Sequence, residues 1–144
     1  MDRYFETFRG HVLNSKCDRM GHMNIQFYGN CISHAMQSIF PKIGYTAEHI
    51  KNRSKGMVAV EQQNRFRGEL LVGDLMHMVS GIAGFTEKSI TVHHKLYNSA
   101  TEKLSYESLV TALHFDMQKR KVVAFDEKTL SKLQSLKLQE EVSL

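Results

Sequence analysis

The hydrophobic pattern of the chain changes from a helical to an extended period near residue 57. Upstream, apolar residues recur every three or four positions over residues 25–40, the spacing of an amphipathic helix, and Pro41 ends the pattern. A first strand is expected near residues 7–13, and a helical pattern over 127–140 predicts an amphipathic terminal helix. Downstream of residue 57, apolar and polar residues alternate as in strands over residues 57–64, 75–83, 89–97, 104–115 and 121–125.

These elements occur in the order strand, helix, then four or five strands joined by short turns. Because no helix separates the later strands, they cannot form parallel crossover units, and the sheet is expected to be mainly antiparallel. The early helix must then cover one face of this sheet, and Thr46 is a suitable cap for a short second helix. A length of 144 residues is typical of one domain, so the sequence predicts a single α+β domain over residues 1–144.

Composition excludes several classes of protein. The chain has no run of about 18 apolar residues that could span a membrane, and its charged first residues do not resemble a secretory signal. Cys17 and Cys31 are too few for a disulfide framework and are expected to be reduced thiols of a cytoplasmic protein. The adjacent His93 and His94 would point to opposite faces of a strand, which is poor geometry for one metal ion, so no metal site is predicted.

The candidate chemistry lies just before the first helix, in the segment Cys17-Asp18-Arg19-Met20-Gly21-His22-Met23-Asn24. This segment places a carboxylate, a turn glycine and a capping asparagine where the helix begins. The first N–H groups of a helix have no partner within it and carry about half a positive charge. A carboxylate beside such donors can act as a nucleophile or activate water, while the donors stabilise an oxyanion. Taken alone, Asp18 is interpreted first as a residue that interacts with the helix N-terminus or fixes the turn.

This segment and a second one resemble the 4-hydroxybenzoyl-CoA thioesterase family, which has the hotdog fold. The first match is Asp-x-x-Gly-His-Met-Asn before the amphipathic helix. The second is Val60-Glu61-Gln62-Gln63-Asn64-Arg65-Phe66, followed by Gly73-Asp74. The resemblance covers about residues 8–126. It implies an antiparallel sheet wrapped around a long central α-helix, with a short C-terminal helix, and hydrolysis of an acyl-CoA to a carboxylic acid and free CoA.

The resemblance also implies roles for residues near the turn. Asp18 occupies the place of the family's catalytic Asp, as nucleophile or general base, and the backbone N–H of Ile25 occupies that of the oxyanion donor. His22 would polarise the carbonyl or orient the leaving sulfur, or else be an ordinary hydrogen-bonded loop histidine. Asn24 is interpreted first as a helix cap, with substrate contact as the alternative. Glu61 matches an acidic position of the family and either faces the site or is solvated.

The charge of the chain suits a phosphorylated ligand. There are 19 basic and 15 acidic residues, a net charge of +4, although an ordinary, slightly basic surface is the first explanation of this balance on its own. Lys119, Arg120 and Lys121 could bind the phosphates of CoA or form a solvated hairpin tip. The sequence has no basic stripe with interleaved aromatic residues, so nucleic-acid binding is not expected. The resemblance implies no cofactor besides the substrate's own CoA, and a homodimer or homotetramer with the active site at the subunit interface.

Two other functions are compatible with the same fold. Hotdog hydratases and dehydratases resemble this chain in fold but use a different His-and-Asp motif, which this chain lacks. A non-catalytic acyl-CoA-binding or regulatory module would gain little from a carboxylate beside the thioester, so the presence of Asp18 argues against it. The sequence does not identify the acyl group.

Overall fold

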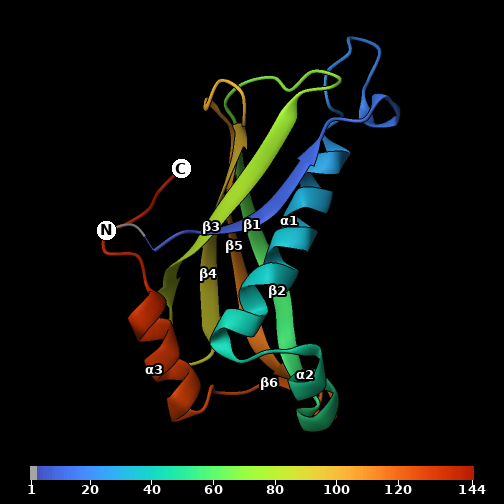
Figure 1. Cartoon of the computed structure of the whole chain (residues 1–144). Coiled ribbons are helices and arrows are strands. Elements are labelled where there is room, and N and C mark those ends of the chain that lie inside the picture. The colour runs from blue at the N-terminus through green and yellow to red at the C-terminus, as the bar shows by residue number, and fades with distance from the viewer. Residues whose placement is uncertain (1–2) are drawn as a thin grey trace.

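The fold is built on one six-stranded sheet (Figure 1). The computed structural model describes residues 3–144, apart from the side chain of residue 53. The strands lie in the order β1-β3-β4-β5-β2, with β6 paired to β5. Each neighbouring pair is antiparallel, as the sequence predicts. The strands are β1 (Phe5–His11), β2 (Lys55–Phe66), β3 (Leu75–Phe85), β4 (Ser89–Asn98), β5 (Leu104–Asp116) and β6 (Lys121–Val122).

Helix α1 (Gln26–Ile39) packs across one face of the curled sheet (Figure 1). At its end the chain continues into the 3-10 turn η2 (Phe40–Ile43), where Pro41 cannot extend the α-helical hydrogen bonds. The helix has 14 residues, so it is shorter than the long central helix that the resemblance implies. Its buried face consists of Tyr28, Cys31, Ile32, Ala35, Met36 and Ile39.

Two shorter helices begin at capping side chains, of which the sequence predicts Thr46. Helix α2 (Ala47–Arg53) begins at Thr46, whose side chain accepts a hydrogen bond from the His49 amide at 3.1 Å. Helix α3 (Glu127–Leu136) begins at Asp126, which accepts from the Thr129 amide at 2.7 Å. Helix α3 ends at Leu136, earlier than the predicted residue 140. The next residue, Lys137, instead forms a parallel bridge with Ile82 of β3.

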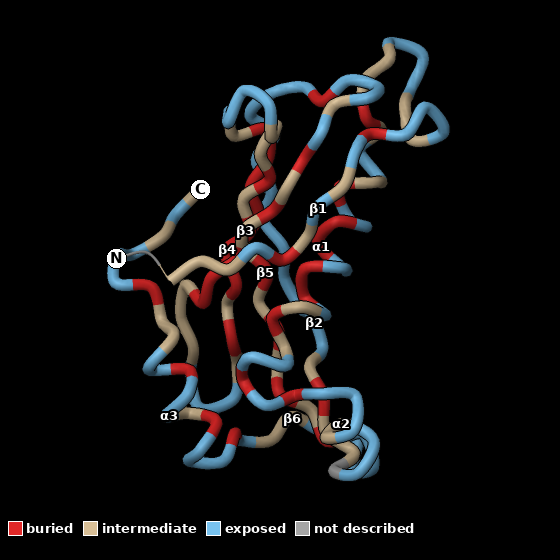
Figure 2. The backbone as a smooth tube through the Cα atoms, in the orientation of Figure 1, coloured by how far each residue is buried: buried red, intermediate tan, exposed pale blue. Residues whose placement is uncertain are grey.

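Burial differs strongly between the strands (Figure 2). The inner faces of β4 and β5 are buried against α1, as at Val92 and Val110. Strand β2 lies at the edge of the sheet, with β5 as its neighbour on one side, and is exposed from Val58 to Phe66. An edge strand of 12 residues leaves a row of backbone donors and acceptors without strand partners on its outer side.

A chain of polar side chains runs through the core under α1. The Thr7 and Ser80 hydroxyl groups lie 2.7 Å apart, and Ser80 Oγ lies 2.6 Å from Nδ1 of His94. His94 is completely buried, and this burial lowers its pKa to about 3. The imidazole is therefore neutral, as a polar group in a core must be unless it is paired with an opposite charge.

Candidate active site

The predicted turn before α1 is closed by its own backbone. Cys17 pairs with Met23 in an isolated antiparallel bridge. Within that bridge, the Asp18 amide donates to the His22 carbonyl at 2.9 Å, and the Gly21 amide donates to the Asp18 carbonyl at 3.1 Å. Gly21 has φ +80, in the left-handed region that glycine adopts without steric cost. The motif glycine is thus required by the geometry of the turn.

One oxygen of the Asp18 carboxylate is held by this turn. Its Oδ1 accepts hydrogen bonds from the Met20 amide at 2.9 Å and from the His22 amide at 3.2 Å. The side chain is exposed, and within residues 3–144 its Oδ2 accepts no hydrogen bond. The backbone therefore orients the carboxylate. Because both amide hydrogen bonds go to Oδ1, the lone pairs of Oδ2 stay available.

The start of α1 leaves one donor without a partner. Asn24 Oδ1 accepts from the Gln26 amide at 3.2 Å, and the Asn24 carbonyl accepts from the Phe27 amide at 3.0 Å. Asn24 therefore caps the first turn of the helix, as the sequence predicts, because Ile25, which directly precedes α1, already has helical φ and ψ angles. In the part of the chain that the structure describes, the intervening Ile25 amide donates to no acceptor. This free N–H lies at the positive end of the helix dipole, within seven residues of Asp18.

His22 is held by a residue that the sequence did not single out. Its Nε2 lies 2.7 Å from Oε2 of Glu69, and a backbone bridge pairs His22 with Leu71. The histidine is thus hydrogen-bonded within its loop, and the turn places its backbone next to Asp18, whose Oδ1 accepts from the His22 amide. No local pattern connects Glu69 with His22, because the contact joins two loops that are distant in the sequence.

Glu61 lies on the outer side of the sheet. Met57 and Ala59 pair with His114 and Ala112 of the inner face, so simple alternation would also direct Glu61 inward. A bulge at Val60 shifts the register, however, and Glu61 pairs with Thr111 on the opposite face. Within residues 3–144, its carboxylate accepts from Gln63 Nε2 at 3.3 Å and makes no bond to the Asp18 turn.

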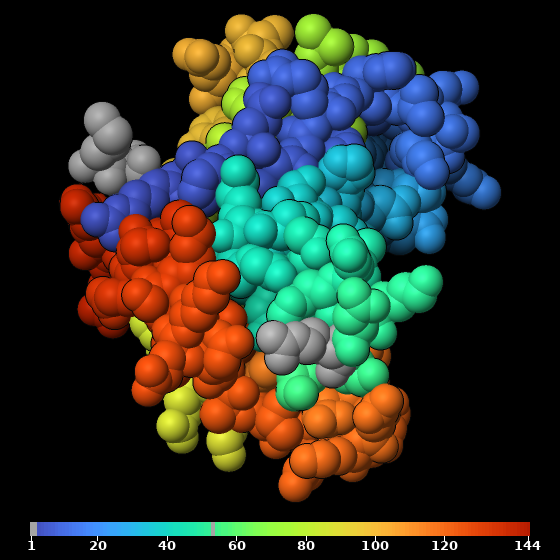
Figure 3. All heavy atoms as spheres, turned by 60° about the horizontal axis from the view of Figure 1, so that its bottom comes forward, coloured from blue at the N-terminus to red at the C-terminus, as the bar shows by residue number. Residues whose placement is uncertain are grey.

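The basic residues Lys119, Arg120 and Lys121 lie at the end of the sheet opposite the Asp18 turn (Figures 1 and 3). They form the exposed tip between β5 and β6, where Arg120 has φ +56. Asp116 Oδ1 accepts from the Gln118 and Lys119 amides at 3.0 Å each. The hydrogen bond from Lys119 is the main cause that lowers the pKa of Asp116. A single chain therefore does not bring the basic tip to the turn.

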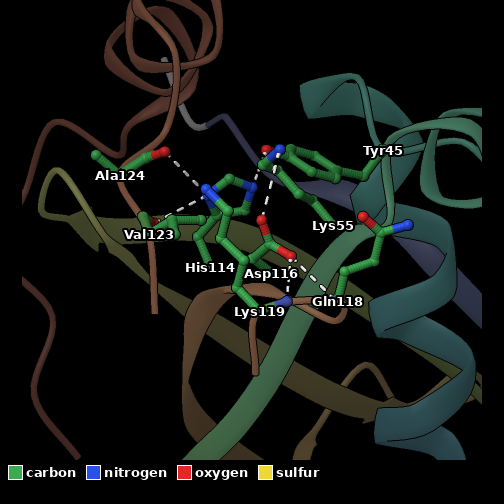
Figure 4. A network of polar contacts seen from close by, with 8 residues as sticks. All are labelled: Tyr45, Lys55, His114, Asp116, Gln118, Lys119, Val123 and Ala124. Carbon is green, nitrogen blue, oxygen red and sulfur yellow. Dashed lines mark hydrogen bonds and ion pairs between the residues drawn. The ribbon is translucent and has the colours of Figure 1, made fainter. Parts of the chain in front are cut away.

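A buried hydrogen-bond network anchors the base of this tip (Figure 4). His114 Nδ1 lies 3.0 Å from the Val123 carbonyl and 3.2 Å from that of Ala124, so the ring proton is on Nδ1. Nε2 then accepts from the Tyr45 hydroxyl at 2.7 Å. Burial lowers the pKa of His114, which keeps the imidazole in this neutral form. We call these contacts the Tyr45–His114 network.

The adjacent histidines of β4 point to opposite faces, as predicted. His93, on the outer face, lies 2.9 Å from Glu107 through Nε2 and 2.7 Å from the Tyr4 hydroxyl through Nδ1. Burial lowers the pKa of His93 despite the neighbouring carboxylate. Burial opposes ionisation of Glu107 as well, but hydrogen bonds from His93 and Arg67 outweigh it and lower the pKa of that carboxyl. No cluster of three metal-ligating side chains occurs among the described residues.

In the part of the chain that the structure describes, α1 has a cavity on each flank. One, of about 280 Å³, lies between the N-terminal half of α1 and strands β1 and β3, and we call it the β1-side cavity. The other, of about 260 Å³, lies between α1 and strands β2 and β5, and we call it the β2-side cavity. A larger surface groove of about 810 Å³ separates η2 from α3. Asp18 lines none of the three, so its carboxylate is open to solvent in the single chain.

Comparison with known proteins identifies the family. A sequence model described as the thioesterase-like superfamily matches residues 12–133. The chain belongs to the thioesterase-like superfamily. Membership identifies it as a thioester hydrolase with the hotdog fold, as the turn and the second motif indicated. No helix in residues 3–144 is both long and apolar enough to cross a membrane.

Individual relatives of this thioesterase are distant in sequence. Betainyl-CoA thioesterase of Pseudomonas aeruginosa is 21% identical over 136 residues, which cover 94% of this chain and 86% of that protein. A hypothetical protein of Staphylococcus aureus, solved in complex with CoA, superposes with a TM-score of 0.84 at 17% identity, covering 94% of this chain and 85% of that one. A 1,4-dihydroxy-2-naphthoyl-CoA thioesterase of Synechocystis gives a TM-score of 0.78 at 12% identity, over 92% and 97% of the two chains. The structural likeness supports the hotdog fold.

Proposed function

We propose that this thioesterase hydrolyses an acyl-CoA to a carboxylic acid and free CoA at the turn before α1. One observation carries the proposal. Within residues 18–25, as the structure describes them, two groups keep unused hydrogen-bonding capacity: Oδ2 of Asp18 and the amide of Ile25. The family and the CoA-thioester substrate in the name of the P. aeruginosa relative support CoA as the thiol. Water and groups of the protein suffice for this reaction.

Two routes use the same groups. In the first, an Asp18 oxygen bonds to the thioester carbon, the C–S bond breaks, CoA leaves as thiolate, and water then hydrolyses the mixed anhydride. In the second, Asp18 takes a proton from a water molecule as that water attacks the same carbon, the C–S bond then breaks, and CoA leaves as the thiol with the proton that Asp18 returns. In both, the Ile25 amide and the helix dipole stabilise the negative charge on the carbonyl oxygen. Asn24 fixes the helix start, and His22, held by Glu69, orients the leaving sulfur.

A second copy of the chain is needed to complete this site. The exposed edge of β2 carries Val58 and Val60, which are 43% and 55% exposed, and its outer backbone groups are those that a second strand would satisfy. Antiparallel pairing of two β2 strands about a two-fold axis would place the Lys55 end of one beside the Phe66 end of the other. The homodimer would thereby bring the 119–121 tip of one protomer towards the Asp18 turn of its partner.

In this dimer, the two sets of predicted site residues that lie away from the Asp18 turn in a single chain would have roles. Lys119, Arg120 and Lys121 would bind the CoA phosphates across the interface. Glu61, near the middle of β2, would lie in the interface itself and support the site from there. Two such dimers would make the homotetramer that the family resemblance also allows.

The proposal is tested by Asp18→Asn assayed with a panel of aromatic, short, branched and long acyl-CoAs. The amide removes the nucleophile or base, and kcat is expected to fall by about two orders of magnitude or more, with an unchanged melting temperature. Asp126→Asn is the matched control, because asparagine caps α3 as well as aspartate does. An unimpaired Asp18→Asn enzyme would remove Asp18 from the mechanism. Tight binding of acyl-CoA without turnover by the unmodified chain would indicate a binding module instead.

A further inference from the structure

The β1-side cavity is apolar at its floor. It has a volume of about 280 Å³. Strands β1 and β3 form one side of it, and helix α1 forms the other. An apolar cavity of roughly 150 Å³ is already large enough to bind benzene. The floor residues share a lack of formal charge and are Phe8, Val12, Met23, Phe27, Cys31 and Met76. Burial raises the pKa of the Cys31 thiol to about 11, so the floor stays neutral at physiological pH.

The same segment forms the cavity wall and the catalytic turn. Lys16 lies two residues before Asp18, Met23 lies two residues before Ile25, and both line the cavity. The Asn24 amide donates to the Lys16 carbonyl at 2.7 Å, which fixes the two sides of the segment together. The cavity is therefore walled by residues two positions away from Asp18 and from Ile25, although neither of these two residues lines it.

The rim of the cavity is polar. Lys16 Nζ lies 4.2 Å from the centre of the Phe27 ring, and the Phe8 and His34 rings are in edge contact with their centroids 5.2 Å apart. Asn30 lies on the exposed side of α1 at the same rim. A few polar groups around an apolar floor are typical of a small-molecule pocket. Burying a charged group against this floor would cost several kcal/mol, because the residues that form the floor carry no formal charge.

From these observations we infer that the β1-side cavity binds the acyl group of the substrate, and that this group is compact and apolar, a single aromatic ring or a short branched chain. The inference rests on the proposed acyl-CoA thioesterase function. The cavity lies on the flank of α1 opposite β2, so pairing through β2 leaves it open. The substrate then crosses the start of α1, with CoA on the β2 flank, the carbonyl at Ile25 and the acyl group on the β1 flank. A long unbranched chain exceeds the volume.

The experiment blocks each flank of α1 in turn. Asn30→Trp fills the rim of the β1-side cavity, and Ser33→Trp fills that of the β2-side cavity. Both are exposed positions on the same helix, so neither change overpacks the core. The readout is the ratio of kcat/KM for benzoyl-CoA to kcat/KM for acetyl-CoA, because a general loss of activity leaves this ratio unchanged. Palmitoyl-CoA is included as the long-chain thioester.

Asn30→Trp is expected to lower this ratio by about tenfold or more, the scale of misfitting one or two groups in an apolar pocket. Ser33→Trp is expected to leave it within about threefold, and unmodified enzyme is expected to prefer benzoyl-CoA to palmitoyl-CoA by about tenfold. An unchanged ratio in Asn30→Trp, an equal or larger fall in Ser33→Trp, or a preference for palmitoyl-CoA would overturn the inference while leaving the thioesterase proposal intact. Failure of the unmodified protein to hydrolyse any of the three would instead count against the thioesterase proposal itself.

Discussion

The Asp18 turn and the Tyr45–His114 network lie at opposite ends of the same sheet and use hydrogen bonds in opposite ways. In the network, both imidazole nitrogens of His114 have partners, and Asp116 nearby accepts two amides at its Oδ1. At the turn, backbone bonds orient Asp18 while its Oδ2 and the Ile25 amide keep free capacity. Satisfied polar groups stabilise a structure, whereas oriented groups with spare capacity are available for chemistry. The two ends should therefore respond differently to the same kind of substitution.

The largest difference is expected from Ile25→Pro. Proline removes the amide hydrogen that we propose stabilises the oxyanion, and loss of such a donor costs about 10²–10³ in kcat. Ile25 has φ −50, which a proline ring accommodates, and first helical positions tolerate proline. The melting temperature should consequently stay close to that of the parent. Steady-state kinetics beside Ile25→Ala, which keeps the N–H, provide the check, and a prolyl variant as active as the alanyl one would exclude this donor.

Acid should destabilise the fold through its buried histidines. The pKa of His94 is about 3 in the folded protein against an ordinary 6.5, so between these values the unfolded chain binds a proton that the folded one does not. Its contribution to stability is complete above about pH 6.5 and is lost as the pH falls towards 3. From pH 7 to pH 5 this amounts to about 2 kcal/mol, and the lowered pKa values of His93 and His114 act in the same direction.

Urea unfolding at several pH values measures this effect. The His94→Gln variant removes one titrating group and should flatten the dependence of the unfolding free energy on pH by about one proton between pH 6 and pH 4. A parent and a variant with parallel pH profiles would show that His94 takes up its proton in the folded state.

Tyr45→Phe should be a pure stability variant. Without the hydroxyl, Nε2 of the buried His114 loses its donor, and an unsatisfied buried acceptor costs about 1–3 kcal/mol. Because the network is remote from the Asp18 turn of its own chain, kcat of the folded enzyme should change little. Tyr97→Phe is the control, since that ring stacks on His77 at the outer face and its loss of a hydroxyl should cost within about 0.5 kcal/mol. A loss of kcat without loss of stability would contradict the assignment.

The sequence predicts this fold well because its signals are local. Alternation, the position of Pro41 and the caps at Asn24 and Thr46 each depend on a few neighbouring residues. The structure agrees with Pro41 and with both caps, whereas the strand predicted over 121–125 is limited to Lys121–Val122. Glu61 shows where locality fails. Alternation from Met57 and Ala59 continues to the inner face, and the unforeseen bulge at Val60 directs Glu61 outward.

The parts of the candidate site that the sequence could not predict depend on distant segments. The contact of His22 with Glu69 joins two loops through a bridge that no periodicity reveals. Lys119 is separated from Asp18 because β5 runs away from the turn towards the opposite end of the sheet. In the proposed site, a second chain brings Lys119 of one protomer towards the Asp18 turn of its partner. Sequence motifs thus identified the groups at the turn, while their partners required the topology.

The smallest expected effect tests whether the 119–121 tip of one protomer binds CoA at the Asp18 turn of its partner. In Lys119→Ala/Lys121→Ala, the CoA phosphates lose two exposed cations, each worth about 0.2–1 kcal/mol. KM for acyl-CoA should rise about three- to tenfold with kcat unchanged. This rise should become smaller with added salt, because salt screens the attraction between the lysines of the parent and the CoA phosphates. Lys128→Ala/Lys132→Ala removes the same charge from α3, beside a groove that the proposed site does not use, and separates a specific contact from net charge. Equal rises in both double variants would mean that the 119–121 tip contributes only through the overall field, and that the proposed two-fold pairing does not deliver it to the partner's turn.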